Sequence, residues 1–285
     1  MRRRFLFLGI FLFVFRLFAH AEDVISGYTL RKIEEFVTYR VVLKSESVDF
    51  AYQTISKLRD EALADLPDHA IDFEQEERIL ESLYLTEYYE RSLSSSGNQK
   101  ELRSQMKAQM KKNIACIDRS GPKKISGWLY QLTGDVTSYY MTRSVTATFL
   151  YGRRVKTYYE KALEMDKTLS LPRVCLGNWC FYAPRIFGGG IKKALRHYES
   201  ALETAELPGE KYLAYISMSQ INYESKNPEK AREYLEMAAG LGLGRKDLDL
   251  IERCNEMGLS YFQYLRNRSG IDEQMSEDEK DEDDR

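Results

Sequence analysis

The pattern of apolar and polar residues along this chain has the periodicity of α-helices. Behind an apolar N-terminal run, apolar residues recur three and four positions apart in segments that are interrupted by proline, serine and glycine. This spacing places the apolar side chains along one side of a helix. The segments before the middle of the chain are 25–43, 48–66, 73–93 and 100–117. We therefore expect an all-α protein.

A short motif recurs three times in the second half of the chain. Each copy has a small or β-branched residue, an aromatic residue or leucine four positions later, and alanine three positions after that. The copies begin 39 and then 37 residues apart. The spacing of four and three puts all three side chains on one stripe, and alanine lets a neighbouring helix approach closely. The predicted packing positions are Val155, Tyr159 and Ala162, then Ala194, Tyr198 and Ala201, then Ala231, Leu235 and Ala238.

Over residues 125–240 the chain resembles the tetratricopeptide-repeat family. In that family the second helix of a unit of about 34 residues carries Ala, an aromatic residue and Ala at this spacing. Leu176 and Gly177 are similar to the Leu-Gly pair of the first helix, although Trp179 follows the pair instead of preceding it. Asn227 before Pro228 is a suitable start for a second helix. The resemblance implies a helical-repeat α-solenoid and carries no catalytic residues.

Regions outside these repeats complete the predicted organisation. Residues 22–122 form an N-terminal helical region, interpreted as degenerate helix pairs because the three-residue signature is missing there. Residues 123–268 hold the repeats, and a helix at 247–265 is expected to cap the stack, since terminal repeats need a covering element. Residues 1–21 and 269–285 are expected to lie outside the folded body.

The N-terminus has the pattern of a secretory signal. Three arginines precede an apolar run from Phe5 to Val14, and Ala19-His20-Ala21 supplies a small-x-small cleavage site. The run is short for a transmembrane helix and is followed by acidic residues. We expect cleavage after Ala21 and export to the periplasm.

Charge is concentrated at the C-terminus. Removal of residues 1–21 changes the formal net charge from −2 to −6, and residues 272–285 carry nine acidic and two basic side chains. Such a segment buries too little apolar surface to order itself, so a disordered tail is predicted for 269–285. The remaining body has a charge close to zero, which gives no reason to expect nucleic-acid binding.

The candidate chemistry of the chain is sparse. Cys116, Cys175, Cys180 and Cys254 have no zinc-type spacing, and we interpret them as small buried apolar groups. Outside the signal, His69 and His197 are interpreted as surface residues, and the acidic residues around Glu76 as the charged first turn of a helix. We therefore expect no enzyme, no metal and no cofactor.

The segment 178–194 is the most distinctive in the chain. We interpret Pro184, Gly188 and Gly189 as a turn between two repeat helices, in which glycine adopts φ values that other residues resist. Together with Phe187 and Ala194, these residues resemble the corresponding turn in the T components of TRAP-type solute transporters. That resemblance implies an oligomeric periplasmic protein that binds a hydrophobic ligand. Gly190 stands where those proteins have an acidic residue.

Aromatic residues are the best candidates for binding, because aromatic anchors dominate recognition in concave grooves. The candidates on the first helices are Trp128, Tyr140, Trp179, Tyr182, Tyr215 and Tyr223. The leading hypothesis is an exported interaction or scaffold protein that holds a partner protein or peptide. The alternative is a transporter-associated component with a hydrophobic ligand or a transporter subunit as its partner. A homo-oligomer is compatible with either.

Overall fold

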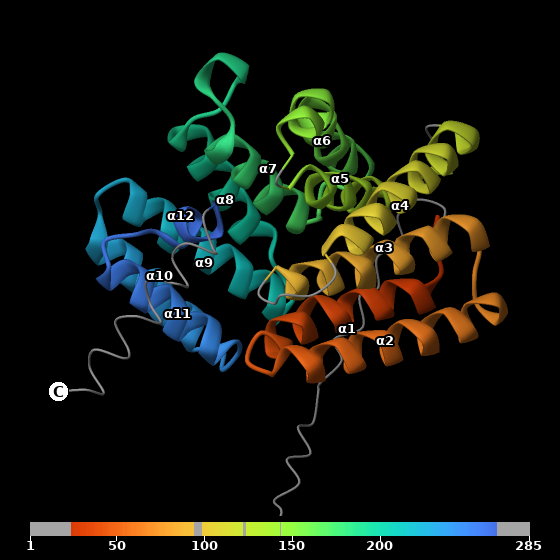
Figure 1. Cartoon of the computed structure of the whole chain (residues 1–285), viewed down its shortest axis with the longest axis horizontal. Helices are drawn as coiled ribbons and strands as arrows, with labels where there is room; N and C mark the ends of the chain where they lie inside the picture. Colours follow the sequence, from red (N-terminus) through yellow and green to blue (C-terminus); the bar gives the residue numbers. More distant parts are fainter. Residues whose placement is uncertain (1–23, 94–98, 122–123, 143, 267–285) are drawn as a thin grey trace, which may run out of the picture.

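The computed structural model describes residues 24–93, 99–121, 124–142 and 144–266. In this part of the chain the protein is all-α, with twelve α-helices in a helical-repeat arrangement, and from α2 onward each helix packs against the next in sequence. Figure 1 shows α1 to α4 along one side and α7 to α12 along the other, with α5 and α6 between them. The predicted signal sequence and acidic tail lie outside the described residues.

The helices are α1 (Gly27–Leu43), α2 (Val48–Asp65), α3 (Phe73–Ser92), α4 (Gln99–Ser120), α5 (Gly127–Met141), α6 (Val145–Met165), α7 (Leu171–Tyr182), α8 (Ile191–Thr204), α9 (Pro208–Glu224), α10 (Pro228–Ala239), α11 (Arg245–Glu256) and α12 (Tyr261–Arg266). Two 3-10 turns, η1 (Leu66–Asp68) and η3 (Arg185–Phe187), follow α2 and α7. None of the helices in the described ranges has the length and apolar character needed to span a bilayer.

Polar side chains fix several helix starts. Ser47, Asp72 and Ser144 each accept a hydrogen bond from the amide three residues later, which satisfies one of the unpaired amides of the first turn. The predicted start at Asn227 and Pro228 is confirmed: α10 begins at Pro228, and the Asn227 side chain accepts a hydrogen bond from the amide of Lys230.

The helix pairs α5/α6, α7/α8 and α9/α10 contain the three copies of the motif. All nine predicted packing residues are buried there. In the first two copies, the tyrosine of the motif also packs against a glycine of the preceding helix. A Cβ atom on Gly134 would lie 2.5 Å from the Tyr159 ring, and one on Gly177 would lie 2.2 Å from the Tyr198 ring. The glycines therefore set the spacing within α5/α6 and within α7/α8.

The tyrosine hydroxyl completes this contact. Tyr159 donates to Asp135 at 2.9 Å, and Tyr198 donates to Asn178 at 2.7 Å. In both pairs the acceptor follows the glycine directly in sequence. The same glycine–tyrosine contact and tyrosine hydrogen bond thus occur in both pairs, which supports the interpretation of α5/α6 and α7/α8 as repeats of one unit.

A buried carboxylate joins α1 to α3. Glu76 lies in the first turn of α3, as predicted for the acidic residues around it, but its side chain is fully buried. It accepts hydrogen bonds from the hydroxyls of Ser26 and Thr29 and from the amides of Ile71 and Asp72. Burial by itself would raise the pKa of Glu76, but these four donors lower the pKa below its usual value of 4.5.

This network makes stability depend on pH. Because the folded-state pKa of Glu76 is lowered, the contribution of its carboxylate is present above pH 4.5 and is lost as the pH falls through the folded pKa. Glu76→Gln turns an amide N–H₂ toward hydrogen-bond donors, so we expect it to lower the free energy of unfolding by about 2–3 kcal/mol near neutral pH.

Urea denaturation near neutral pH and near pH 3 tests this, with the half-exposed Glu74→Gln as the matched control, expected to change stability by less than about 0.5 kcal/mol. A cost of Glu76→Gln that stays the same at both pH values would contradict the assignment.

The two ends of the described chain meet. α1 packs against α9, and a Cβ atom on Gly209 would lie 2.2 Å from the carbonyl oxygen of Val37. Just beyond α1, the Lys44 ammonium bonds the Asp247 carboxylate at 2.9 Å. Figure 1 shows α11 beside α1 accordingly. The stack of helices is therefore closed by its own N-terminal helix.

The predicted capping helix at 247–265 is two helices. α11 ends at Glu256, Gly258 has φ of 78°, and α12 begins at Tyr261. The single-helix prediction was wrong because the apolar periodicity continues across a residue whose left-handed backbone breaks the helix. As a result α12 turns back and buries Phe262 against α7 and α8.

Candidate functional site

The six predicted groove aromatics do not gather in one groove. Trp128 is 7% exposed and belongs to the core around α1 to α3. Tyr140 is half-buried, with the Arg103 guanidinium 4.6 Å above its ring. Tyr215 is half-buried beside Tyr234, with 6.4 Å between ring centroids. These three are held in separate parts of the fold.

Two of the predicted aromatics hold the C-terminal segment of the chain itself. The hydroxyl of Tyr182 donates to the carbonyl of Phe262 at 3.0 Å, and that of Tyr223 donates to the carbonyl of Asn255 at 2.8 Å. The Phe262 ring is buried, and its centroid lies 4.6 Å from the centroid of the Phe181 ring. The surface expected to receive a partner beside α7 and α9 is thus covered by α11 and α12.

The predicted turn residues lie between α7 and α8. Pro184 precedes η3, and Gly188 ends it with φ of 98°. Gly189 is buried against the preceding chain, where a Cβ atom would lie 1.8 Å from the carbonyl oxygen of Ala183. The turn projects η3 away from the helices, at the top of the molecule in Figure 1.

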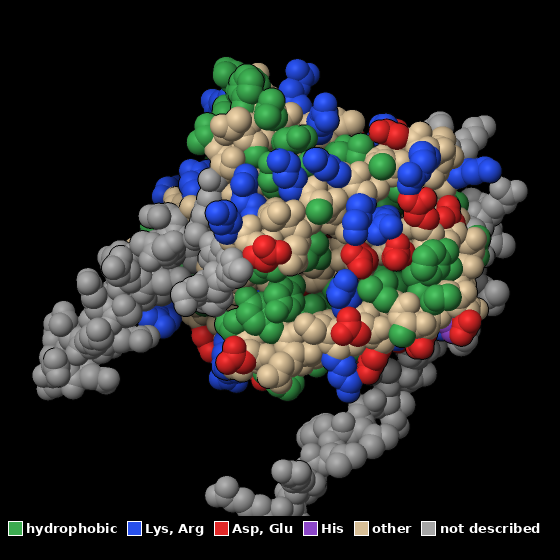
Figure 2. All heavy atoms as spheres, turned by 45° about the vertical axis from the view of Figure 1, so that its right-hand side comes forward, with side chains coloured by type: hydrophobic (Ala, Val, Ile, Leu, Met, Phe, Trp, Pro, Cys, Tyr) green, Lys and Arg blue, Asp and Glu red, His purple; other side chains and the backbone are tan. Residues whose placement is uncertain are grey.

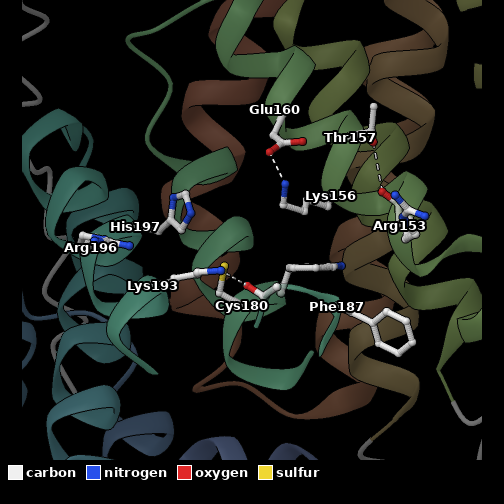
Figure 3. A pocket seen from close by; sticks show the side chains of 11 residues that line it. Arg153, Lys156, Thr157, Glu160, Cys180, Phe187, Lys193, Arg196 and His197 are labelled. Atoms are coloured by element: carbon white, nitrogen blue, oxygen red, sulfur yellow. Dashed lines mark hydrogen bonds and ion pairs between the residues drawn. The ribbon is translucent and has the colours of Figure 1, made fainter. Parts of the chain in front are cut away.

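A pocket of about 630 Å³ opens between α6 and α8, next to this turn. Trp179, the sixth predicted aromatic, lines it, and its indole N–H donates to the carbonyl of Gly152 at 2.8 Å. Figure 3 shows side chains of α6 and of α8 on opposite sides of the opening, with Phe187 of η3 at one edge. The residues that line the pocket are Arg153, Lys156, Thr157, Glu160, Trp179, Cys180, Phe187, Gly188, Lys193, Arg196 and His197.

Positive charge dominates this basic pocket. Arg153 and Lys156 of α6 and Lys193 and Arg196 of α8 line the pocket, and Glu160 is the only acidic residue in its lining. Glu160 is already paired with Lys156, and the Lys193 ammonium donates to the carbonyl of Gly188 at 2.9 Å. Among the described residues, no ion pair involves Arg153, Lys193 or Arg196. The pocket therefore keeps an excess of uncompensated cations.

The positive charges of the pocket affect the pKa values of neighbouring groups. Burial lowers the pKa of His197 below 6.5, and Lys156, Arg173 and Arg196 lower it further. Burial raises the pKa of Cys180, whereas Lys156, Lys193 and Arg196 oppose that rise. His197, expected at the surface, is in fact half-buried and is neutral near pH 7. Lys156 and Arg196 thus act electrostatically on both His197 and Cys180.

Exposed apolar side chains lie beside the pocket. Phe149 stands one helical turn before Arg153 on α6 and is 86% exposed, and Ile186 stands beside Phe187 on η3 and is 85% exposed. We refer to these and their neighbours as the apolar rim, which consists of Val145, Phe149, Leu150, Ile186, Phe187 and Ile191. Figure 2 shows apolar side chains gathered at the top of the molecule, where η3 lies, with Lys and Arg next to them.

The basic pocket was missed in the sequence, although a signal was present. The pairs Arg153/Lys156 and Lys193/Arg196 are each three residues apart, so each pair shares one side of its helix. The apolar stripe of the motif fixes which side is buried, and these cations lie off it. Their convergence depends on the α6–α8 spacing, which no residue pattern states.

Other polar clusters in the described ranges belong to the fold. Asp135 accepts from Gln131 and Tyr159 between α5 and α6, and burial raises the pKa of its carboxyl. His69 stacks on Tyr28 at 4.7 Å. No group of three or more potential metal ligands occurs in the part of the chain that the structure describes. The four cysteines are free thiols.

The fold and this site define an all-α protein with sequentially packed helices and a basic pocket beside an apolar rim. No protein-family model matches the chain, and no curated protein matches it.

Proposed function

We propose that this protein is an exported, non-enzymatic interaction module that binds a partner protein through the apolar rim and the basic pocket. The observation that carries the proposal is the clustering of exposed large apolar side chains. Val145, Phe149 and Ile186 are each at least 85% exposed, and Phe187 of the same rim lines the pocket. Contiguous apolar surface rimmed by polar residues marks interaction sites in soluble proteins.

The proposal assigns the repeats to the tetratricopeptide type, whose members commonly bind other proteins. The recurring contact between glycine and tyrosine in α5/α6 and α7/α8 supports this assignment, together with the buried alanines of each motif. Export rests on the signal-like residues 1–21. The docking face differs from the one expected in the sequence, because α11 and α12 cover the inner aromatic surface.

A partner would gain most from the two phenylalanines of the rim. We expect Phe149→Ser combined with Phe187→Ser to weaken partner binding by about 2–4 kcal/mol, since each ring loses its burial against the partner. Both rings already face solvent, so the fold should be unaffected. Native mass spectrometry of the protein purified gently with its bound material measures the change.

The matched control is Phe50→Ser, because Phe50 of α2 is 47% exposed, close to the 57% of Phe187, and lies outside the rim. A protein retained in fixed ratio by the wild type and by Phe50→Ser, and lost from the double variant, is the expected result. Retention of the same protein by all three would contradict the proposed face.

A further inference from the structure

We infer that the basic pocket binds an acidic peptide segment of the partner, with carboxylate side chains lying between α6 and α8. This inference deepens the proposed function and rests on it. The geometry that suggests it is the placement of four cations around the pocket: Figure 3 shows Arg153 and Lys156 of α6 on one side and Lys193 and Arg196 of α8 on the other. Carboxylates are the protein groups that such cations recognise.

The arrangement of the cations favours a chain-like ligand over a single small anion. Arg153 and Lys156 lie one turn apart on α6, as do Lys193 and Arg196 on α8. Four cations in two rows can meet several carboxylates spaced along a peptide. The pocket also opens toward the apolar rim through Phe187, so a peptide that carries an apolar residue beside its acidic run contacts both.

The pocket is prepared for such a ligand. The Trp179 indole is fixed by its bond to the Gly152 carbonyl, and Lys193 is tethered to the Gly188 carbonyl, so neither side chain needs to be reordered on binding. Arg153 and Arg196 are exposed and have no described carboxylate partner. These two arginines are free to pair with incoming carboxylates without breaking an existing ion pair.

The test uses the chain from Glu22 to Arg285 and a fluorescent synthetic peptide with a run of glutamates followed by one phenylalanine. Arg153→Gln combined with Arg196→Gln removes two pocket charges and no described ion pair. We expect the double variant to bind the peptide about tenfold more weakly in fluorescence anisotropy, and binding by the wild type to weaken as salt is raised.

Arg154→Gln combined with Lys192→Gln is the control, because these exposed residues adjoin Arg153 and Lys193 in sequence, lie outside the pocket and carry the same total charge. We expect it to change affinity by less than about twofold. Equal weakening in both double variants would overturn the inference, as would equal binding of a peptide with glutamine in place of glutamate, or equally tight binding of inorganic phosphate alone.

The outcome separates this inference from the proposed function. Loss of the natural partner from the Phe149/Phe187 variant, together with unchanged peptide binding by the Arg153/Arg196 variant, would overturn the acidic-peptide assignment and leave the docking face in place.

Discussion

Asp247→Ala is expected to lower the free energy of unfolding by about 3–5 kcal/mol, because it removes the acceptor on which three parts of the fold converge. The buried Asp247 carboxylate of α11 accepts from Lys44 at 2.9 Å, and from the hydroxyls of Tyr212 and Tyr261 at 3.0 Å each. Burial and the Asp247 charge raise the pKa of Tyr212, so its hydroxyl stays protonated and remains a donor. Without the carboxylate, an ammonium and two buried hydroxyls lose this shared acceptor, and the Tyr212 hydroxyl keeps only its longer bond of 3.3 Å to the carbonyl of Gly244.

Urea denaturation followed by circular dichroism measures this loss. Asp249→Ala is the matched control, since Asp249 lies on the same helix, carries the same charge and is exposed. It should change stability by less than about 0.5 kcal/mol. Similar effects of the two substitutions would show that Asp247 does not join α1, α9 and α12 as described.

Gly177→Ala is expected to destabilise the protein by about 1–3 kcal/mol, although alanine favours a helix more than glycine does. The new methyl group would lie 2.2 Å from the Tyr198 ring, a separation that requires the helices to move apart. Tyr198 cannot yield easily, because it is fully buried and its hydroxyl is held by Asn178 at 2.7 Å.

Gly152→Ala is the matched control, because the same substitution is expected to stabilise the protein at this position. Gly152 lies within α6, and a Cβ atom there has no neighbour within 4 Å. Alanine should therefore stabilise the helix by about 0.5–1 kcal/mol. Thermal denaturation of the two variants tests this: the midpoint should fall for Gly177→Ala and rise for Gly152→Ala. A shift of both midpoints in the same direction would contradict the role of Gly177 in repeat packing.

The helical class and the repeat packing were predictable because both depend on local spacing. The stripe formed by Ala194, Tyr198 and Ala201 needs only helical periodicity, and the start of α10 needs only Asn227 and Pro228. Closure of the stack was not predictable in this way. It depends on Lys44 and Asp247, which are far apart in sequence and have ordinary neighbours there.

The candidate site was predictable only in part, for a physical reason. Trp179 was identified as a binding aromatic and lines the pocket, but Trp128 has the same amphipathic side chain and is core. An aromatic ring satisfies a core position as well as a binding surface, so residue type does not separate the two. Arg153 and Arg196 become a site only because α6 and α8 bring them to one pocket.

The most direct test of the central claim is site-specific photo-crosslinking in the cells that produce the protein. A photoreactive amino acid is placed at Phe187 on the apolar rim and, in a second version, at Phe50 on α2. We expect the Phe187 position to capture one partner protein reproducibly and the Phe50 position not to capture it. Capture of that protein from Phe50 but not from Phe187 would contradict the account, because the partner would then bind a different face of the helical stack.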